Sequence, residues 1–162
     1  ERMPGVLVEV LVPDFHARSE LILTVVKAKP EVYNHNLETV ERLSREVRPQ
    51  AEYGRSLRVL RLSKEMGGKG LKTKSGLMVG LGERPEEVRR SLEDLREAGC
   101  DLLTIGQYLQ PTPIHRPVAE FIPPEQFDLY RSWGEEMGFS FVASAPYVRS
   151  SYNAFEALST HA

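Results

Sequence analysis

The sequence predicts an α/β fold built from about four or five parallel strands with flanking helices. Short apolar runs rich in β-branched residues alternate along the chain with longer segments whose apolar residues fall on one helical face. Proline and glycine separate these segments. Strands that alternate with helices pair in parallel through right-handed crossovers. Since a closed barrel needs about eight strands, two architectures remain: an open doubly wound sheet, or part of a TIM-like barrel.

Two strands and three helices are expected in the first part of the chain. Pro13 closes the first apolar run, and Pro30 and Pro49 stop the first two helices. The third helix ends at the Gly67-Gly68 pair. The expected elements are a strand over 6–12, a helix over 19–28, a strand over 31–35, and helices over 37–47 and 56–66.

Three strands and two helices are expected in the second part. Pro85 at a first turn, followed by the acidic residues Glu86 and Glu87, suits the positive end of a helix. Gly99 and Gly138 stand where C-terminal caps are expected. The expected elements are a strand over 77–80, a helix over 85–98, a strand over 102–107, a helix over 125–137 and a strand over 139–143.

Composition excludes several classes of protein. The 162 residues, 41% hydrophobic and 27% charged, are those of an ordinary globular domain. The net charge of −2 offers no basic surface to nucleic acid, and no apolar run approaches the roughly 20 residues that cross a membrane. The single cysteine, Cys100, excludes a disulfide framework or a multi-cysteine metal site built from this chain alone. A lone thiol suits the reducing cytoplasm, and because Cys100 precedes a strand we expect it to be structural.

Polar side chains follow four of the expected strands, at the point where each strand ends. Because the carboxyl ends of parallel strands meet at one edge, which is where such folds bind ligands, we expect these side chains to form a site. Amides, an imidazole and carboxylates suit a polar metabolite. The alternative is that they only cap helices and shape loops. The four segments are 12–16, 33–38, 80–83 and 106–111.

The single motifs leave alternatives open. Gly80 and Gly82 begin a dinucleotide-type pattern whose third glycine would fall at Pro85, so that pattern fails. The amides of this turn either hold an anion or a nucleotide, or serve the turn alone. We expect His35 to be a hydrogen-bonding residue in the wall of the site. The stretch 149–152, Arg-Ser-Ser-Tyr, is explained by its residues alone as a helix cap.

Taken together, these segments resemble the lipoyl synthase family. Their order and spacing hold from about residue 6 to residue 155. The matching text is VPDF at 12–15, YNHNLE at 33–38, TKSGLMVGLGE at 73–83, TIGQYLQP at 104–111 and VRSSYNA at 148–154. The resemblance implies that residues 1–145 are the C-terminal portion of a radical S-adenosylmethionine barrel and residues 146–162 a C-terminal tail.

The resemblance implies a sulfurtransferase of lipoate biosynthesis that carries two [4Fe–4S] clusters. In this family one cluster binds S-adenosylmethionine and cleaves it to a 5′-deoxyadenosyl radical, which removes hydrogen from C6 and C8 of an octanoyl group. The second, auxiliary cluster is consumed to supply both sulfur atoms. The implied partner is an octanoylated lipoyl-carrier domain in the cytoplasm, with no nucleic acid and no membrane.

Site residues follow from the same resemblance. Lys74 is placed in the wall of the site. Ser151 is implied as the serine ligand to one iron of the auxiliary cluster, with Arg149 as a catalytic residue near the substrate. The residues implied to bind S-adenosylmethionine are Asn34, Asn36, Glu38, Gly80, Gly82 and Gln107.

The chain departs from the family pattern in several places. The two cysteine triplets that hold the clusters lie upstream in the family and are absent here, as are the first two barrel strands. His16-Ala17-Arg18 stands where the family often has a glycine, and Asn153 stands where histidine is common. Because the chain opens with Glu1, we expect the natural N-terminus, with any targeting signal, to be missing. We therefore expect a family fragment that is inactive alone; the rivals are a stand-alone α/β nucleotide-binding module and a folded, non-functional piece of barrel.

Overall fold

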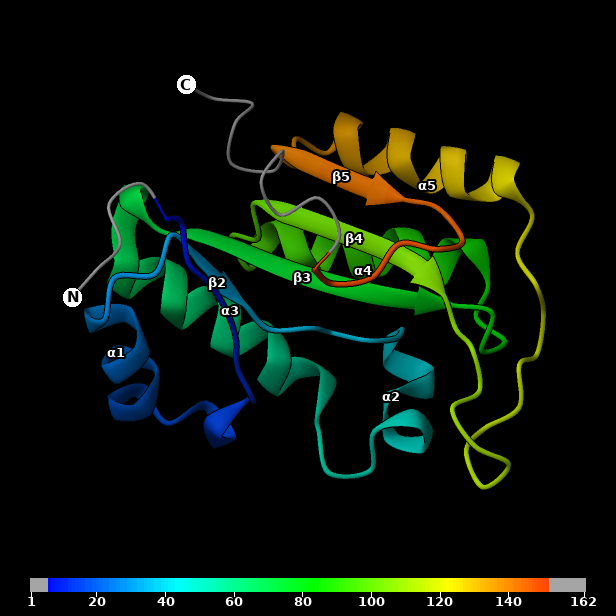
Figure 1. Ribbon diagram of the computed structural model, residues 1–162, viewed down its shortest axis with the longest axis horizontal. Helices are drawn as coiled ribbons and strands as arrows, with labels where there is room; N and C mark the ends of the chain where they lie inside the picture. Colours follow the sequence, from blue (N-terminus) through cyan, green and yellow to red (C-terminus); the bar gives the residue numbers. More distant parts are fainter. Residues whose placement is uncertain (1–5, 152–162) are drawn as a thin grey trace.

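The computed structural model describes residues 6–151, which form a five-stranded sheet with helices packed against it (Figure 1). The strands lie in chain order, and each pairs in parallel with the next. Their bounds are β1 Glu9–Leu11, β2 Val32–Asn34, β3 Lys72–Val79, β4 Leu102–Gln107 and β5 Phe141–Ser144. The predicted α/β class with parallel pairing is confirmed.

The order of the strands also decides between the two predicted architectures. A strand order that follows the chain, joined by right-handed crossovers, places the connecting helices on the same face of the sheet. A doubly wound sheet instead reverses its order at a switch point. The structure is therefore an arc of a TIM-like barrel. The helices are α1 Ser19–Lys27, α2 Glu41–Val47, α3 Tyr53–Gly67, α4 Pro85–Glu97 and α5 Pro124–Glu136.

The two faces of the sheet carry different residues. On the outer face, alternate strand residues such as Leu77 and Ile105 pack with residues of α2, α3, α4 and α5 into one buried cluster. Each fully buried leucine or isoleucine there contributes about 1.5–3 kcal/mol to stability. The next residues along the same strands, such as Gly76 and Thr104, point to the opposite, inner face. Because these are small or polar, the inner face is left open to a ligand.

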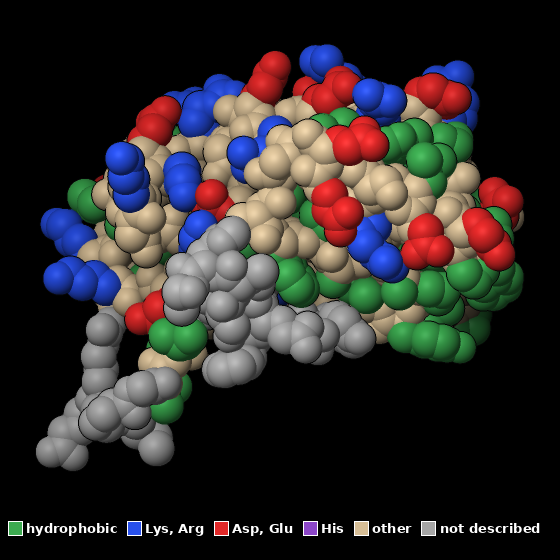
Figure 2. Space-filling view, turned by 90° about the horizontal axis from the view of Figure 1, so that it is seen from above, with side chains coloured by type: hydrophobic (Ala, Val, Ile, Leu, Met, Phe, Trp, Pro, Cys, Tyr) green, Lys and Arg blue, Asp and Glu red, His purple; other side chains and the backbone are tan. Residues whose placement is uncertain are grey.

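Figure 2 shows charged side chains of both signs mixed over most of the face that it presents. Hydrophobic side chains gather toward the right of that view, the end at which the arrows of β3, β4 and β5 point in Figure 1. Large apolar residues are exposed in the segments that follow β4 and β5: Leu109, Ile114, Phe121 and Tyr147. None of the helices within residues 6–151 is long and apolar enough to cross a membrane.

Several predicted elements differ from the structure in their bounds; α3, for example, begins at Tyr53 and not at Ser56, and β5 begins at Phe141 and not at Phe139. β1 covers only residues 9–11 of the run expected over 6–12. β3 begins at Lys72, before the strand expected over 77–80. The sequence did not indicate the first half of this strand, because that half is polar and its pairing partners are distant in sequence. The helix expected from Leu37 begins only at Glu41. The predicted helical part of the tail and the RSSY motif beyond Ser151 lie outside the described residues.

The turn that follows β1 adopts a backbone conformation that favours glycine. Phe15, His16 and Ala17 have φ angles of 48°, 51° and 52°. For residues with a Cβ atom, a left-handed conformation costs roughly 1–2 kcal/mol. The side chain of Asp14 holds the turn by accepting a hydrogen bond from the His16 amide at 2.9 Å. Here the chain has Ala17 in a segment where the resemblance led us to expect a glycine.

We expect Ala17→Gly to raise the free energy of unfolding by about 0.5–1 kcal/mol, since relief of the left-handed strain outweighs the added freedom of the unfolded chain. Denaturant unfolding measures the change. Ala98→Gly is the matched control, because Ala98 is also buried but has a right-handed φ of −74°. The control should be destabilised. Equal destabilisation of both variants would contradict the strain at Ala17.

Candidate functional site

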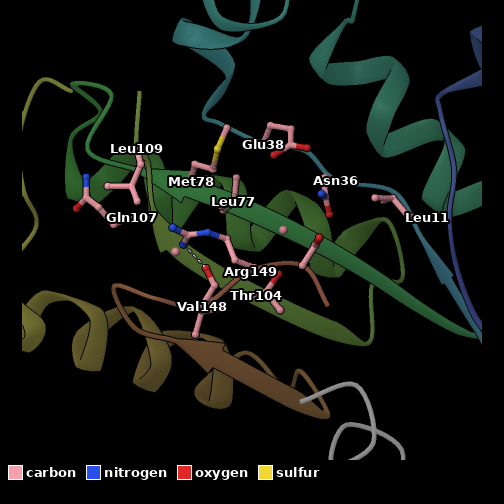
Figure 3. Close-up of a pocket in the computed structure, with 13 residues that line it drawn as sticks. Leu11, Asn36, Glu38, Leu77, Met78, Thr104, Gln107, Leu109, Val148 and Arg149 are labelled. Atoms are coloured by element: carbon pink, nitrogen blue, oxygen red, sulfur yellow. Dashed lines mark hydrogen bonds between the residues drawn. The ribbon is translucent and has the colours of Figure 1, made fainter. Parts of the chain in front are cut away.

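A cleft of about 390 Å³ lies on the inner face, toward the carboxyl ends of the strands (Figure 3). Its walls come from segments far apart in the sequence: the ends of β1 and β2, the inner residues of β3 and β4, and the segment after β5. This is the edge at which the sequence predicted a site. The residues that line this cleft and favour a ligand site are Asn36, Glu38, Gly76, Thr104, Gly106 and Arg149.

Asn36 offers the cleft an unused acceptor. Its Oδ1 is buried and has no hydrogen-bond partner within the described residues. A Cβ atom placed on Gly76 would lie 2.9 Å from Thr104 Oγ1 and 3.0 Å from Asn36 Oδ1. The glycine therefore keeps open the space in front of both polar groups. Because buried polar groups are nearly always paired, a ligand that donates a hydrogen bond here fits the site.

Glu38 is held in a strained conformation at the same cleft. Its φ is 71°, which is rare for a residue with a side chain. Two backbone hydrogen bonds to β3 hold it: the Glu38 amide donates to Gly76 O at 2.9 Å, and the Met78 amide donates to Glu38 O at 2.7 Å. Strain of this kind clusters at functional sites. The carboxylate of Glu38 borders the cleft in Figure 3.

Asn34 and Lys74 lie on the same face but do not line the cleft. Lys74 is fully buried, and its Nζ lies 3.0 Å from Glu9 Oε2. Asn34 Nδ2 donates to the other oxygen of Glu9 at 2.7 Å. The three side chains thus form a buried ionic layer one inward-facing residue nearer the amino ends of the strands than Asn36 and Gly76. They lie beneath the cleft, whereas the resemblance implied that Asn34 binds the cofactor and that Lys74 is in the wall of the site.

The turn after β3 does not present free amides. The Gly80 amide donates to Glu83 Oε1 at 2.5 Å and the Leu81 amide donates to Glu83 Oε2 at 2.9 Å. The carboxylate of Glu83 therefore occupies the position at which these amides could have held a bound anion. Gly80 and Gly82 have φ angles of 97° and 99°, so the turn itself requires glycine. Neither glycine lines the cleft, unlike the prediction.

Gln107 lines the cleft, yet its amide is already engaged. Nε2 donates to Tyr108 O and to Glu120 O, both at 3.0 Å, and Oε1 accepts from the Ile122 amide at 2.9 Å. The side chain fixes the long connection between β4 and α5. Because both ends of the Gln107 side-chain amide are already hydrogen-bonded, Gln107 offers a cofactor no unused group comparable to Asn36 Oδ1.

His35 and Cys100 are both buried away from the cleft. His35 Nδ1 lies 2.9 Å from Val12 O and its Nε2 lies 3.0 Å from Ser56 Oγ. Burial lowers the pKa of His35, so the ring is neutral at pH 7 and ties the end of β1 to α3. Burial raises the pKa of the Cys100 thiol to about 12, which leaves it protonated and unreactive.

The segment after β5, residues 145–151, brings Arg149 and Ser150 to the cleft. Arg149 Nη1 donates to Val148 O at 2.6 Å and to Pro146 O at 3.3 Å. Its remaining nitrogens have no partner among residues 6–151. Ser150 lines the cleft, whereas Ser151 is exposed and does not. The predicted iron ligand therefore adjoins the site without forming its wall.

Sequence reasoning did not single out Gly76, Thr104 and Gly106, although Gly106 begins the 106–111 segment expected at the site and the resemblance implied that the backbone of 76–83 borders the cofactor. Each looks like an ordinary residue of a buried strand. The available signal was the alternation within β4, where Thr104 and Gly106 lie on either side of Ile105 and so share one face of the strand.

Within residues 6–151, no group of three or more His, Cys, Asp or Glu side chains is placed to hold a metal ion. The only cysteine, Cys100, precedes β4 at the opposite end of the sheet. The described residues by themselves therefore do not fit an iron–sulfur cluster, which cysteines normally hold.

Curated proteins named lipoyl synthase match nearly all of this chain. That of Rubrobacter xylanophilus is 57% identical over 154 residues, which are 95% of this chain and 48% of the relative. That of Caldanaerobacter subterraneus is 56% identical over 98% of this chain and 56% of the relative. That of Thermus thermophilus is 54% identical over 95% of this chain and 48% of the relative. The chain spans about half the length of the curated relatives it matches, in their C-terminal part.

Two further comparisons bear on the fold and the family. No protein-family model matches the chain. Among solved structures, the HMG-CoA lyase of Bacillus subtilis aligns with a TM-score of 0.51, covering 88% of this chain and 54% of that one. The two are 17% identical, so this likeness concerns the fold alone. It agrees with an arc of a TIM-like barrel.

Proposed function

We propose that this chain is the cofactor-binding part of a lipoyl synthase. Nearly its whole length is homologous to about half of each curated lipoyl synthase that it matches. The observation that carries the proposal is the 57% identity over 154 residues. The reaction is the insertion of two sulfur atoms at C6 and C8 of an octanoyl group bound to a lipoyl-carrier domain. As a sulfurtransferase of this kind, the protein works in a reducing, cytoplasmic environment, which its lone free cysteine suits.

The cleft has the groups that S-adenosylmethionine requires. Asn36 Oδ1 accepts a hydrogen bond from a ribose hydroxyl or an ammonium group, and Glu38 offers a carboxylate to the same groups. Gly76 leaves the room that the ligand needs. When bound, this cofactor supplies the radical that removes hydrogen from the octanoyl chain. The chain's own residues bind and orient it.

The substrate side of the cleft fits an acyl chain on a carrier domain. Arg149 keeps nitrogens without a partner among the described residues at the mouth of the cleft. Leu109, which also lines the cleft, is exposed together with other apolar residues after β4 and β5. Exposed apolar surface of this kind marks sites that bind apolar ligands or partners. We propose that the octanoyl group enters here.

Two [4Fe–4S] clusters belong to the proposed enzyme, and their cysteine ligands would come from its other half. Of this chain, Ser151 is proposed as the ligand to one iron of the auxiliary cluster. The rival function, a stand-alone nucleotide-binding module, would explain the glycine turn and the polar ends of the strands; at that turn Glu83 already accepts from the amides of Gly80 and Leu81.

We expect the isolated chain to bind no stable iron–sulfur cluster, because it has one thiol and clusters need about three or four cysteine ligands. Anaerobic reconstitution followed by iron and sulfide analysis measures this. A stoichiometric cluster on the monomer would overturn the division of the ligands between the two halves.

The function is tested with a chimera in which this chain replaces the matching 154 residues of the Rubrobacter xylanophilus lipoyl synthase. We expect the chimera to restore growth without lipoate to a bacterial strain that lacks lipoyl synthase. A chimera that carries Gly54→Ala is the neutral control, since a Cβ atom at Gly54 meets nothing within 4 Å. A stable chimera that restores no growth, while the parent enzyme does, would contradict the proposed function.

A further inference from the structure

Gly106, on the inner side of β4 near its carboxyl end, lies in contact with the backbone of the 145–151 segment. A Cβ atom at this position would overlap the carbonyl oxygen of Val148 and lie 3.1 Å from its carbonyl carbon. The same atom would lie 3.2 Å from Arg149 Nη1. A glycine inside a strand weakens it and often marks such a close approach of another backbone.

The close approach of another segment, and not the backbone conformation, explains why residue 106 is a glycine. Gly106 is not among the glycines with a positive φ, so its backbone conformation is open to residues with a side chain. Its partner in the register is Met78 of β3, a residue of ordinary size. The contact with Val148 and Arg149 is what an alanine at this position would disturb.

The 145–151 segment is attached along β4 on both sides of Gly106. The Ala145 amide donates to Ile105 O and the Gln107 amide donates to Pro146 O, both at 3.2 Å. The chain then turns, with the Val148 amide donating to Ala145 O at 3.1 Å. Val148 is buried, and Arg149 reaches back to the carbonyls of Pro146 and Val148. Moving the Val148 carbonyl therefore moves the guanidinium as well.

We propose that Gly106 is a positioning residue, which places Arg149 and the two serines that follow it at the cleft by letting the Val148 backbone lie directly on β4. Its consequence for catalysis rests on the proposed function, in which these residues serve sulfur insertion. Gly76, on the neighbouring strand, has a different role, because a Cβ atom there would meet Asn36 and Thr104. The two glycines thus make room for different groups: Gly76 for the cofactor, and Gly106 for the 145–151 segment.

The contact is tested first on this chain by NMR, without any assay of function. The unaltered chain should show nuclear Overhauser effects between the Gly106 α protons and protons of Val148 and Arg149. In Gly106→Ala, hydrogen exchange at the Gln107 and Val148 amides should become about tenfold faster or more, as expected for local opening. Gly54→Ala, the neutral control, should change neither amide.

Two results would overturn the positioning role. One is the absence of the Overhauser effects in the unaltered chain. This result would overturn the role even if the Gly106→Ala variant does not fold. The other is a folded Gly106→Ala variant in which both amides exchange as in the unaltered chain.

The catalytic consequence is tested in the chimera by measuring 5′-deoxyadenosine and lipoyl product together. Gly106→Ala should lower the lipoyl product formed per 5′-deoxyadenosine about tenfold or more, whatever its effect on the affinity for S-adenosylmethionine. Gly76→Ala should weaken that affinity and leave the product ratio unchanged. An unchanged ratio in Gly106→Ala contradicts the role in catalysis. A chimera that makes no lipoyl product in any form counts against the proposed function, and the amide exchange still decides the position of the segment.

Discussion

Replacing Glu38 by glycine should weaken S-adenosylmethionine binding by the chimera about 10- to 100-fold without loss of protein stability, since an unpaired buried polar group costs about 1–3 kcal/mol. The carboxylate borders the cleft, and its loss leaves cofactor donors without an acceptor. The backbone gains from the change, because the φ of 71° at this position suits glycine. Loss of binding together with unchanged or higher stability separates a functional residue from a structural one.

Glu38→Ala is the matched comparison. It removes the same carboxylate but keeps a Cβ atom in the left-handed conformation, so its affinity should equal that of Glu38→Gly. Its free energy of unfolding should be lower than that of the glycine variant, by about 0.5–1 kcal/mol. Glu41→Ala, at an exposed position in the first turn of α2, is the control for affinity and should leave it unchanged. Calorimetry and denaturant unfolding measure affinity and stability; unchanged affinity in the two Glu38 variants would remove this residue from the site.

Ser151→Ala in the chimera should leave 5′-deoxyadenosine formation largely intact and lower lipoyl formation about 10- to 100-fold, the range found when the surroundings of a metal ligand are disrupted. Oxygen is an uncommon ligand to an iron–sulfur cluster, where cysteine is the rule. A serine suits an iron that must be released when the cluster gives up sulfur. Cofactor cleavage depends on the other cluster and should not need this serine.

Ser150→Ala is the control that the structure makes most informative. Ser150 lines the cleft and Ser151 is exposed, so geometry and resemblance favour different serines. We expect the milder effect from Ser150→Ala. Full lipoyl formation by Ser151→Ala together with its loss in Ser150→Ala would transfer the ligand role to Ser150.

The elements that could be predicted from the sequence are those whose apolar pattern is local. β4 has the predicted bounds, and α1 and α5 agree to within one residue at each end, because their periodicity and their proline and glycine boundaries are complete within the segment. The first half of β3 could not be predicted. Lys74 looks like a surface residue there, and only the ion pair with Glu9, 65 positions earlier in the chain, allows it to be fully buried.

The location of the cleft was predictable, but the hydrogen bonding of the side chains around it was not. The rule that ligands bind at the carboxyl ends of parallel strands placed the cleft correctly. Gln107 and the Gly80 turn looked free, yet their partners, Glu120 and Glu83, are set by how the loops fold back. The sequence placed Gly106 in a segment expected at the site, but not its contact with Val148, because the chain that lies against it comes from beyond β5.

Sulfur insertion by the purified chimera is the most direct test that this chain is the cofactor-binding half of a lipoyl synthase. With both clusters reconstituted, an octanoyl-lysine peptide, S-adenosylmethionine and a low-potential reductant such as dithionite are supplied under anaerobic conditions, and lipoyl product and 5′-deoxyadenosine are quantified by mass spectrometry. We expect lipoyl product from the unaltered chimera, and a sharp decrease in it with Glu38→Gly and with Ser151→Ala. Formation of 5′-deoxyadenosine without lipoyl product, by a chimera that holds both clusters, would contradict the assignment.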